Sequence, residues 1–287
     1  MPPPADLATL HRRNNRESAE LWQRFAGHRA RVTTLALDTA PPEGAGTLAV
    51  LGAGNCNDLD LAAITRRFAE VHLVDLDAEA VARARARQDP EVAAKLHLHA
   101  PVDLSGHFDR LGRFKATPAT PVELANMPRL SVEKVRAALP GQFDVVMSTC
   151  FLSQLMQSAY IALGPEHRQL HLIACALALA HVRLVTALLA PGGTAHLVTD
   201  AVTTESYPLI ELWDRQPPRA LLEELERKEN VFSGTGPSFL RRILATDAQV
   251  APHLTGAARL VEPWLWPFTD ERSYLVYALS FQRAATR

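Results

Sequence analysis

The chain of 287 residues has few of the features that mark several protein classes. Its three cysteines, Cys56, Cys150 and Cys175, are too few for a disulfide framework, and each lies within or beside an apolar run. Neither charge is in excess: 30 basic and 31 acidic residues give a formal net charge of −1. Such a chain has no general attraction to nucleic acid or to anionic membranes. We therefore expect reduced cysteines, no nucleic-acid partner and no membrane association.

Targeting signals and lysine are also scarce. The residues at positions 1–6 have neither the basic nor the apolar region of a signal peptide, so we expect a cytoplasmic protein. The most hydrophobic stretch, residues 170–190, contains His171, His181 and Arg183, which favours a core helix over a membrane span. Lysine supplies only four of the basic residues, a skew typical of GC-rich bacterial genomes.

What the chain does contain is a regular alternation of apolar strands and amphipathic helices. Short apolar runs predict five strands, at residues 48–51, 71–75, 95–100, 143–148 and 194–200. The segments between them include predicted helices at 59–68, 78–88 and 166–189, and two more helices are predicted after the fifth strand, at about 218–228 and 237–245. The alternation predicts an α/β fold with a doubly wound, mostly parallel sheet.

The ends of the chain follow different patterns. Residues 7–37 predict one or two amphipathic helices, and residues 259–266 and 273–281 predict an antiparallel terminal hairpin. We therefore expect a helical N-terminal cap over residues 1–43 and a nucleotide-binding domain over 44–287. An insertion at about 105–141, with a short helix near 132–139, interrupts that domain.

A glycine turn and an acid stand where α/β proteins bind nucleotides. Gly52-Ala53-Gly54 follows the first strand, and Asp75 ends the second strand 21 residues after Gly54. Glycine lets main chain approach a ligand, and a carboxylate at that distance can accept hydrogen bonds from ribose hydroxyls. The sequence thus predicts an adenosine site. The alternative is an α/β core in which the glycines only form turns.

Two residues after the turn bear on the type of nucleotide. A dinucleotide fingerprint has a third glycine where this chain has Asn57. Asp58, which we place in the first turn of the next helix, would oppose a pyrophosphate, since helix N-termini at this position attract anions. A cofactor with a cationic amino-acid end, such as S-adenosylmethionine (SAM), fits better.

With these motifs, residues 47–281 resemble the class I SAM-dependent methyltransferases. Residues 48–54 resemble the first motif of that family, 74–77 its ribose-binding acid, and 188–193 the turn before its fifth strand. Asp103-Leu104 resembles the adenine-contacting pair, and 143–148 with 152–155 the fourth strand and the loop beneath the methyl group. The resemblance implies a seven-stranded sheet whose antiparallel strand comes from the terminal hairpin.

The chain also departs from the family pattern. Val50 stands where the family usually has an acid, and Cys56 where it has a third glycine. Recognition of the methionine amine is therefore expected to shift to Asn55, Asn57 or Asp58. The cofactor-binding residues that the resemblance implies are Gly52, Ala53, Gly54, Asn55, Asn57, Asp58, Asp75, Leu76, Asp103, Leu104, Ser148, Thr149 and Cys150.

The resemblance further implies methyl transfer to an acceptor above the strand ends. Alignment of the acceptor and exclusion of water supply most of the rate in such a displacement. A small-molecule acceptor is expected, and residues proposed to contact it are Trp22, Phe25, His28, Arg29, Gln154, Tyr160 and Tyr207. Asp200 and Gln154 are the candidate catalytic residues. A loop carboxylate for Asp200, and simple packing for Trp22 and Phe25, are the alternatives.

Other readings remain beside this one. Cys150 could attack a pyrimidine ring and assist methylation at carbon. His167 with His171, or His97 with His99, could each contribute to a metal site, but neither pair has a third ligand at a recognisable spacing, so we expect no metal. The rival functions are a nicotinamide-dependent oxidoreductase and a protein that binds SAM without turnover. The sequence defines neither the acceptor atom nor the oligomeric state.

Overall fold

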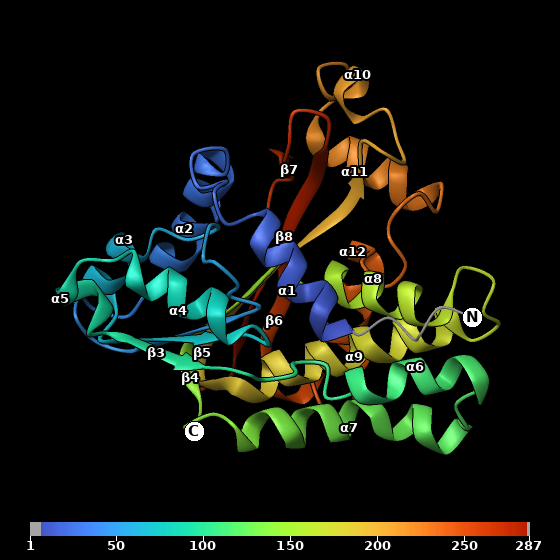
Figure 1. Ribbon diagram of the computed structural model, residues 1–287, viewed down its shortest axis with the longest axis horizontal. Helices are drawn as coiled ribbons and strands as arrows, with labels where there is room; N and C mark the ends of the chain where they lie inside the picture. The colour runs from blue at the N-terminus through green and yellow to red at the C-terminus, as the bar shows by residue number, and fades with distance from the viewer. Residues whose placement is uncertain (1–6, 286–287) are drawn as a thin grey trace.

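An eight-stranded sheet runs through the computed structural model, which describes residues 7–285 (Figure 1). The strand order is β3-β2-β1-β4-β5-β8-β6, and β7 also pairs with β8. Only β8 runs against the others, between β5 on one side and β6 and β7 on the other. The strands are β1 Thr47–Leu51, β2 Glu70–Val74, β3 Leu96–His99, β4 Phe143–Thr149, β5 Leu189–Thr203, β6 Leu254–Leu260, β7 Trp264–Pro267 and β8 Ser273–Arg283.

The predicted fold class is therefore confirmed: a mostly parallel sheet with an antiparallel C-terminal strand. The sheet has one strand more than expected. The predicted strand at 259–266 is divided at Val261-Glu262-Pro263 into the end of β6 and the start of β7. Proline cannot donate to a strand ladder, which accounts for a break at this point.

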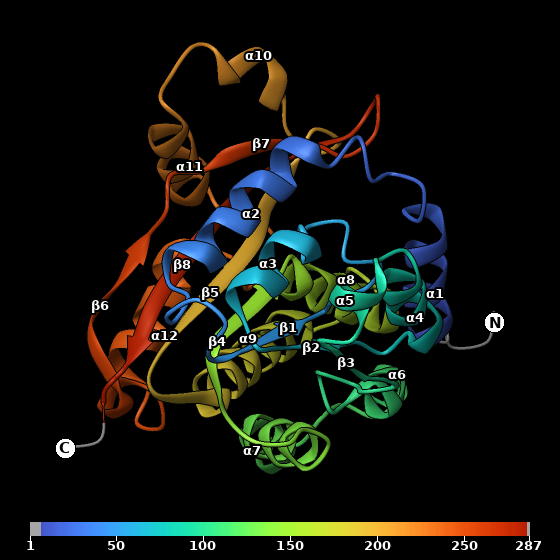
Figure 2. The same cartoon turned by 90° about the vertical axis from the view of Figure 1, so that its left-hand side faces the viewer.

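Helices cover both faces of the sheet (Figure 2). One face carries α2 (Ala26–Asp38), α3 (Leu61–Arg67) and α4 (Ala78–Ala86), and its core includes Val32, Ile64 and Val81. The other carries α7 (Pro121–Ala137), α8 (Phe151–Leu163) and α9 (Leu170–Leu188) over a second apolar cluster. A strand with helices on both faces is buried on both, which explains the continuous apolar run at the end of β1.

The insertion before β4 is more helical than predicted. It holds α6 (Phe108–Ala116) and the 17-residue helix α7, in place of one short helix near 132–139. Thr120 and Glu123 form a capping box at the start of α7, and Pro121 occupies its first turn. The helix thus begins well before the predicted start at 132 and includes Pro128, which the prediction leaves in the segment before the helix.

The long helix predicted at 166–189 was also wrong in its limits. Residues 152–155, expected in a loop, lie in the first turns of α8, and α9 follows after a short connection. α9 ends at Leu188, so Pro191-Gly192-Gly193 belongs to β5 rather than to a helix end. By length and composition α9 could cross a membrane, but 56% of its apolar window is buried, mainly by packing among neighbouring helices and strands.

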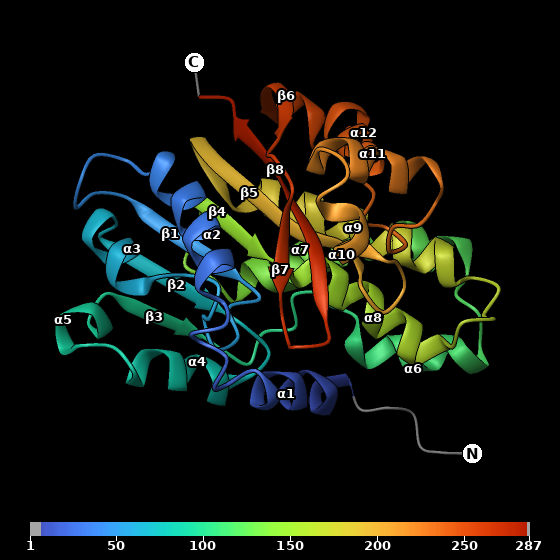
Figure 3. The same cartoon turned by 90° about the horizontal axis from the view of Figure 1, so that it is seen from above.

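The C-terminal part matches its predicted helices closely. α11 (Pro218–Arg227) and α12 (Pro237–Thr246) lie where the sequence predicted them, and a short additional helix, α10 (Leu209–Trp213), precedes them. The short α5 (Pro90–Ala93) precedes β3. At the other end of the chain, α1 (Leu7–Glu17) lies on the side of the sheet toward which β1, β2 and β3 point (Figure 3).

Candidate functional site

The order of the parallel strands reverses between β1 and β4, and open α/β sheets bind ligands at the carboxyl ends of such strands. At this point β1 ends in the glycine turn. Gly52 has φ of +73°, and a Cβ there would come within 2.7 Å of Phe151 Cβ, so only glycine fits without displacing α8. Cys56, which stands where the family pattern has a third glycine, has φ of +51°, a conformation uncommon outside glycine.

Asp75 meets the glycine turn directly. Gly54 N donates to its Oδ2 and Asp77 N to its Oδ1, each at 2.8 Å. Burial raises the pKa of Asp75 to about 6, while these main-chain donors act in the opposite direction. A carboxylate has about four acceptor positions, so both oxygens retain capacity for further donors such as hydroxyl groups.

Two of the three expected amine-binding residues, Asn55 and Asn57, hydrogen-bond the N-terminal segment. Asn55 Nδ2 donates to the carbonyl of Asn15 at 2.5 Å, and Asn57 Nδ2 to that of Ser18 at 2.7 Å. Arg87 donates to the carbonyl oxygen of Asn55. These bonds fasten the connection between α1 and α2 to the glycine turn.

α1 spans the strand ends between two anchors. Asn15 donates to Asp77 Oδ2 at 3.1 Å, and its Oδ1 lies 2.8 Å from the position of a Cβ on Gly54. At the other anchor His11 contacts Ser158 Oγ at 2.9 Å and hydrogen-bonds Gln154, both on α8. α1 thus covers the glycine turn, at which the sequence predicts an adenosine site. Gln154, a predicted catalytic residue, contacts this helix.

A second group of polar residues lies at the ends of β4 and β5. Asp200 Oδ1 accepts from Ser153 Oγ at 2.6 Å, and the Cys150 thiol also hydrogen-bonds Asp200. Cys150 has φ of +49°, a conformation that costs energy outside glycine and is common at functional sites. Burial raises the pKa of Asp200 to about 6, which leaves this carboxylate able to accept a proton near neutral pH.

The surroundings of Cys150 disfavour it as a nucleophile. Burial and the neighbouring charges of Asp200 and Asp58 raise its pKa well above the usual value. The thiolate is the reactive form, and thiolates form in electropositive, accessible sites. The pyrimidine-attack alternative therefore receives no support from the site.

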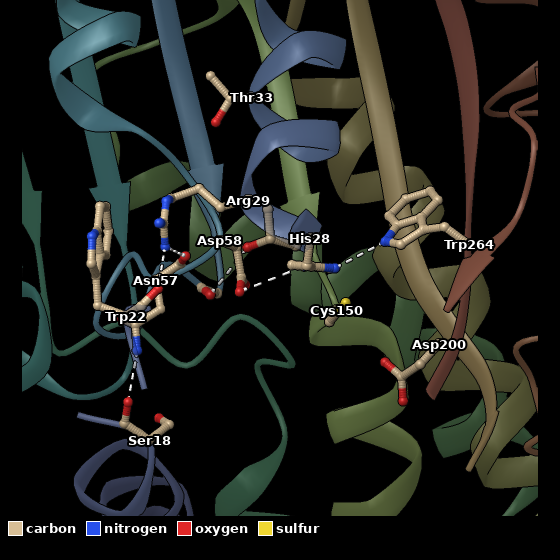
Figure 4. A network of polar contacts seen from close by, with 12 residues as sticks. Ser18, Trp22, His28, Arg29, Thr33, Asn57, Asp58, Cys150, Asp200 and Trp264 are labelled. Carbon is tan, nitrogen blue, oxygen red and sulfur yellow. Dashed lines mark hydrogen bonds and ion pairs between the residues drawn. The ribbon is translucent and has the colours of Figure 1, made fainter. Parts of the chain in front are cut away.

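Asp58 and His28 face each other without a hydrogen bond (Figure 4). Trp264 Nε1 donates to His28 Nδ1 at 3.1 Å, so the proton of the neutral ring lies on Nε2. That nitrogen is 3.6 Å from Asp58 Oδ1, and both atoms are buried with no other partner. His28 also stacks on Trp266, with ring centroids 4.1 Å apart. The pair therefore offers one donor and one acceptor to a third group.

Burial dominates the electrostatics of this pair. It lowers the pKa of His28 to about 3, so the ring is neutral at physiological pH. It raises the pKa of Asp58 to about 7, assisted by the charge of Asp200. Asp58 does not lie in the first turn of α3 as predicted. It belongs to the preceding loop, and Asp60 caps the helix by accepting from Ala63 N. Asp58 and Asp200, both with raised pKa values, thus lie close enough to interact at the carboxyl ends of the parallel strands.

The other expected residues are spread more widely. Arg29 contacts the Trp22 ring at 3.5 Å and donates to the carbonyls of Trp22 and Asn57. Phe25 is buried against Trp266 and Phe268, which is packing. The remaining expected residues have these surroundings: Tyr160 is exposed on α8, Tyr207 is half-buried after β5, Ser148 contacts His181 at 2.7 Å, and the Thr149 hydroxyl lies 3.5 Å from the carbonyl of Gly52.

The residues expected to contact adenine lie after β3. Asp103 accepts from Ser105 and from the main-chain N–H of Phe108, at the start of α6. Leu104 is buried, Leu76 is half-buried, and a hollow of about 270 Å³ opens beside Asp103 toward Lys134. Three contributors were missed from the sequence, His11, Asn15 and Trp264, and Ser153 lay within the matched motif at 152–155 without an expected role. Their only signals were apolar or helical contexts that suit packing equally well.

Comparison with known proteins gives similarity at the level of the fold. No family model matches the chain, and no curated protein matches its sequence. Among solved structures it is similar to the N-methyltransferase NodS from Bradyrhizobium japonicum in complex with S-adenosylhomocysteine (14% identity, 91% of this chain and 87% of that chain, TM-score 0.42). It is also similar to YcgJ from Bacillus subtilis (12%, 90% and 100%, 0.47) and to a putative methyltransferase from Bacillus halodurans (12%, 91% and 100%, 0.45).

Proposed function

We propose that this protein is a SAM-dependent methyltransferase acting on a small-molecule acceptor. The observation that carries the proposal is the pair Asp58 and Asp200 beside the strand reversal. Both carboxyls have pKa values raised mainly by burial, and Asp58 Oδ1 lacks a partner. Buried carboxylates of this kind favour a cationic ligand, because an opposite charge lowers the cost of ionisation.

The residues at the ends of β1 and β2 fit the nucleoside part of that cofactor. The glycine turn permits close approach of the main chain, and the oxygens of Asp75 can accept from ribose hydroxyls in addition to Gly54 and Asp77. Asp103 and Leu104 lie next along the sheet edge for the adenine. Because Asn15 on α1 lies against Gly54, binding requires the end of α1 to move.

The donor, when bound, supplies a methyl carbon activated by a sulfonium. Asp58 would then accept from the cationic amino-acid end, while the fixed His28 Nε2–H donates to an acceptor atom of the same ligand. Asp200, held by Ser153, would orient the methyl acceptor and take its proton. Closure of α1 would exclude water and keep the reacting groups aligned.

Isothermal titration calorimetry with S-adenosylhomocysteine and with NADH tests the proposal against its oxidoreductase rival. We expect binding of S-adenosylhomocysteine and none of NADH. Asp75→Ala should weaken the binding by about 1–3 kcal/mol, the usual loss when a charged hydrogen-bond partner is removed. Asp89→Ala is the matched control, because Asp89 is exposed and caps no helix with its side chain.

Two results would contradict the proposal: tight binding of NADH alone, or unchanged affinity in a folded Asp75→Ala variant. Methyl transfer to any member of a broad acceptor panel would then separate the enzyme from a protein that only binds the cofactor. In that assay, the acceptor that reacts also identifies the atom that Asp200 serves.

A further inference from the structure

Away from the candidate site, four potential metal ligands share one face of the sheet edge. Glu70 and His72 lie on β2, and His97 and His99 on the neighbouring β3. The register pairs His72 with His97. Alternate residues of a strand point to the same side, so all four side chains lie on the face that also carries Phe143 and the end of α7.

Three of these side chains converge on one point. The ligand atoms of Glu70, His72 and His97 all lie within 4.8 Å of one another. His72 Nε2 is 3.2 Å from Glu70 Oε2, and the His72 and His97 rings stack with centroids 4.8 Å apart. His72 is buried, at 4% exposure, whereas Glu70 and His97 are exposed. A fixed ligand thus lies beside two that can adjust.

The fourth residue determines which nitrogen of His72 is free. His99 Nε2 lies 2.9 Å from His72 Nδ1, and His99 also hydrogen-bonds the main chain of Ala138. With Nε2 directed at His72, the donation to Ala138 falls to Nδ1 of His99. Its Nε2 is then an acceptor, and His72 Nδ1 must donate to it. This leaves the lone pair of His72 Nε2 facing a carboxylate oxygen at 3.2 Å, so either a proton or a metal ion lies between them.

We propose that Glu70, His72 and His97 bind one divalent transition-metal ion of the zinc type. Two imidazoles and one carboxylate form a donor set that Zn²⁺ accepts at about 2.0–2.2 Å, with water in the fourth position. The same nitrogen-rich set disfavours Mg²⁺ and Ca²⁺, which prefer oxygen ligands. His99 is the positioning residue: it fixes the tautomer of His72 from behind, as partners of metal-bound histidines do.

The place of the site indicates its role. Glu70 begins β2, His72 lies in its middle and His97 is the second residue of β3, whereas the candidate active site lies beyond the carboxyl ends of the strands. The ion would therefore join the edge strand β3 to β2, and through His99 to α7, rather than take part in methyl transfer. Edge strands have only one neighbouring strand, so such a link stabilises the place where the sheet is least supported.

Zinc titration of the tag-free, chelator-treated protein tests the proposal by calorimetry and by metal analysis after dialysis. We expect one Zn²⁺ per chain and a rise in melting temperature on addition of zinc. His97→Gln and Glu70→Gln change exposed residues, so both variants should fold, and each should weaken zinc binding at least tenfold. Replacement of His99 by Gln should weaken it about 10–100-fold while leaving the stoichiometry unchanged.

His171→Gln provides the matched control. His171 lies 3.5 Å from Cys175 Sγ on α9, so this exposed pair is the competing site for a soft metal ion. The variant should bind zinc as the parent does, and the Co²⁺ form of the parent should lack a thiolate-to-metal charge-transfer band. The proposal is overturned if His171→Gln abolishes binding, or if His97→Gln and Glu70→Gln bind zinc normally. It is equally overturned if the parent binds no zinc below millimolar concentration, since a proton would then bridge His72 and Glu70.

Discussion

The ends of β1 and β2 differ from the contact between Asp58, in the loop before α3, and His28, on α2, in how their buried polar atoms are paired. At the first, Asp75 accepts from Gly54 and Asp77, and the side chains of the turn hold the α1 connection. At the second, Asp58 Oδ1 and His28 Nε2 have no partner. A buried polar atom without a hydrogen bond costs about 1–3 kcal/mol. The first region is thus preformed and covered, and the second gains most from a ligand.

Removal of the carboxylate at the ends of β4 and β5 should have the largest effect. Asp200 takes the proton of the methyl acceptor in this account. Asp200→Asn should therefore lower the rate of methyl transfer by ~10²–10⁴-fold, with little change in cofactor affinity. Burial raises the pKa of Asp200 to about 6, so the parent rate should rise as pH passes through that value. In rate measurements from pH 5 to 8, Asp200→Asn should lack this rise of the rate with pH.

Ser153→Ala is the control for this experiment, because it removes only the hydroxyl that donates to Asp200. It should keep most of the methyl-transfer rate, and the rise of that rate with pH should move to higher pH. Loss of a hydrogen-bond donor to the ionised form raises a carboxyl pKa. Full activity in Asp200→Asn would contradict the account in which one part of the site binds the cofactor and Asp200 takes the proton of the methyl acceptor.

Asp58→Asn should separate function from stability. Burial raises the pKa of Asp58 to about 7, against about 3.9 in an unfolded chain. Between these values the native state binds more protons, so ionisation at higher pH costs the folded protein stability. The variant avoids that cost and should be more stable than the parent by about 4 kcal/mol at pH 8, with no difference below pH 4, yet bind S-adenosylhomocysteine more weakly.

Urea denaturation at pH 4 and pH 8 measures this difference. Asp89→Asn, at an exposed position, should show no such pH dependence. If Asp58→Asn is less stable than the parent at pH 8, the Asp58 carboxylate already has hydrogen-bond partners within the protein. The two regions would then not differ in how their buried polar atoms are paired.

The smallest effect is expected at the cover over β1 and β2. Asn15→Ala removes the bond to Asp77 and the contact with Gly54, and should cost about 1 kcal/mol of stability. Because the closed segment opposes entry, stopped-flow association of S-adenosylhomocysteine should become faster. Arg12→Ala, an exposed change on the same helix, should leave the rate unchanged. Slower association in Asn15→Ala would indicate that α1 recruits the ligand instead of covering the site.

The sequence was most informative where local patterns determine structure. The apolar run ending β1 and the helix starts at Pro218 and Pro237 predicted their elements well. The same kind of signal failed at Pro128, because α7 packs closely against α9 and continues through the proline. The predicted terminal hairpin formed, but its first strand is divided, and β6 and β7 pair with different parts of β8.

The candidate site was predictable in part for the same reason. The glycine turn and Asp75 belong to a short motif whose spacing implies a contact, and the structure places the two side by side. Trp264 and His28 are 236 residues apart, so no local pattern connects them. Likewise His97 had no third ligand in the sequence, since Glu70 and His72 come from a neighbouring strand through the register of the sheet.

A crystal structure of the complex with S-adenosylhomocysteine tests the central claim most directly. The account predicts electron density across the tips of β1 and β2, with the ribose hydroxyls on Asp75, the amino group at Asp58, and Asn15 displaced from Gly54. Density for the ligand elsewhere, with Asn15 still seated on the turn, would contradict the account.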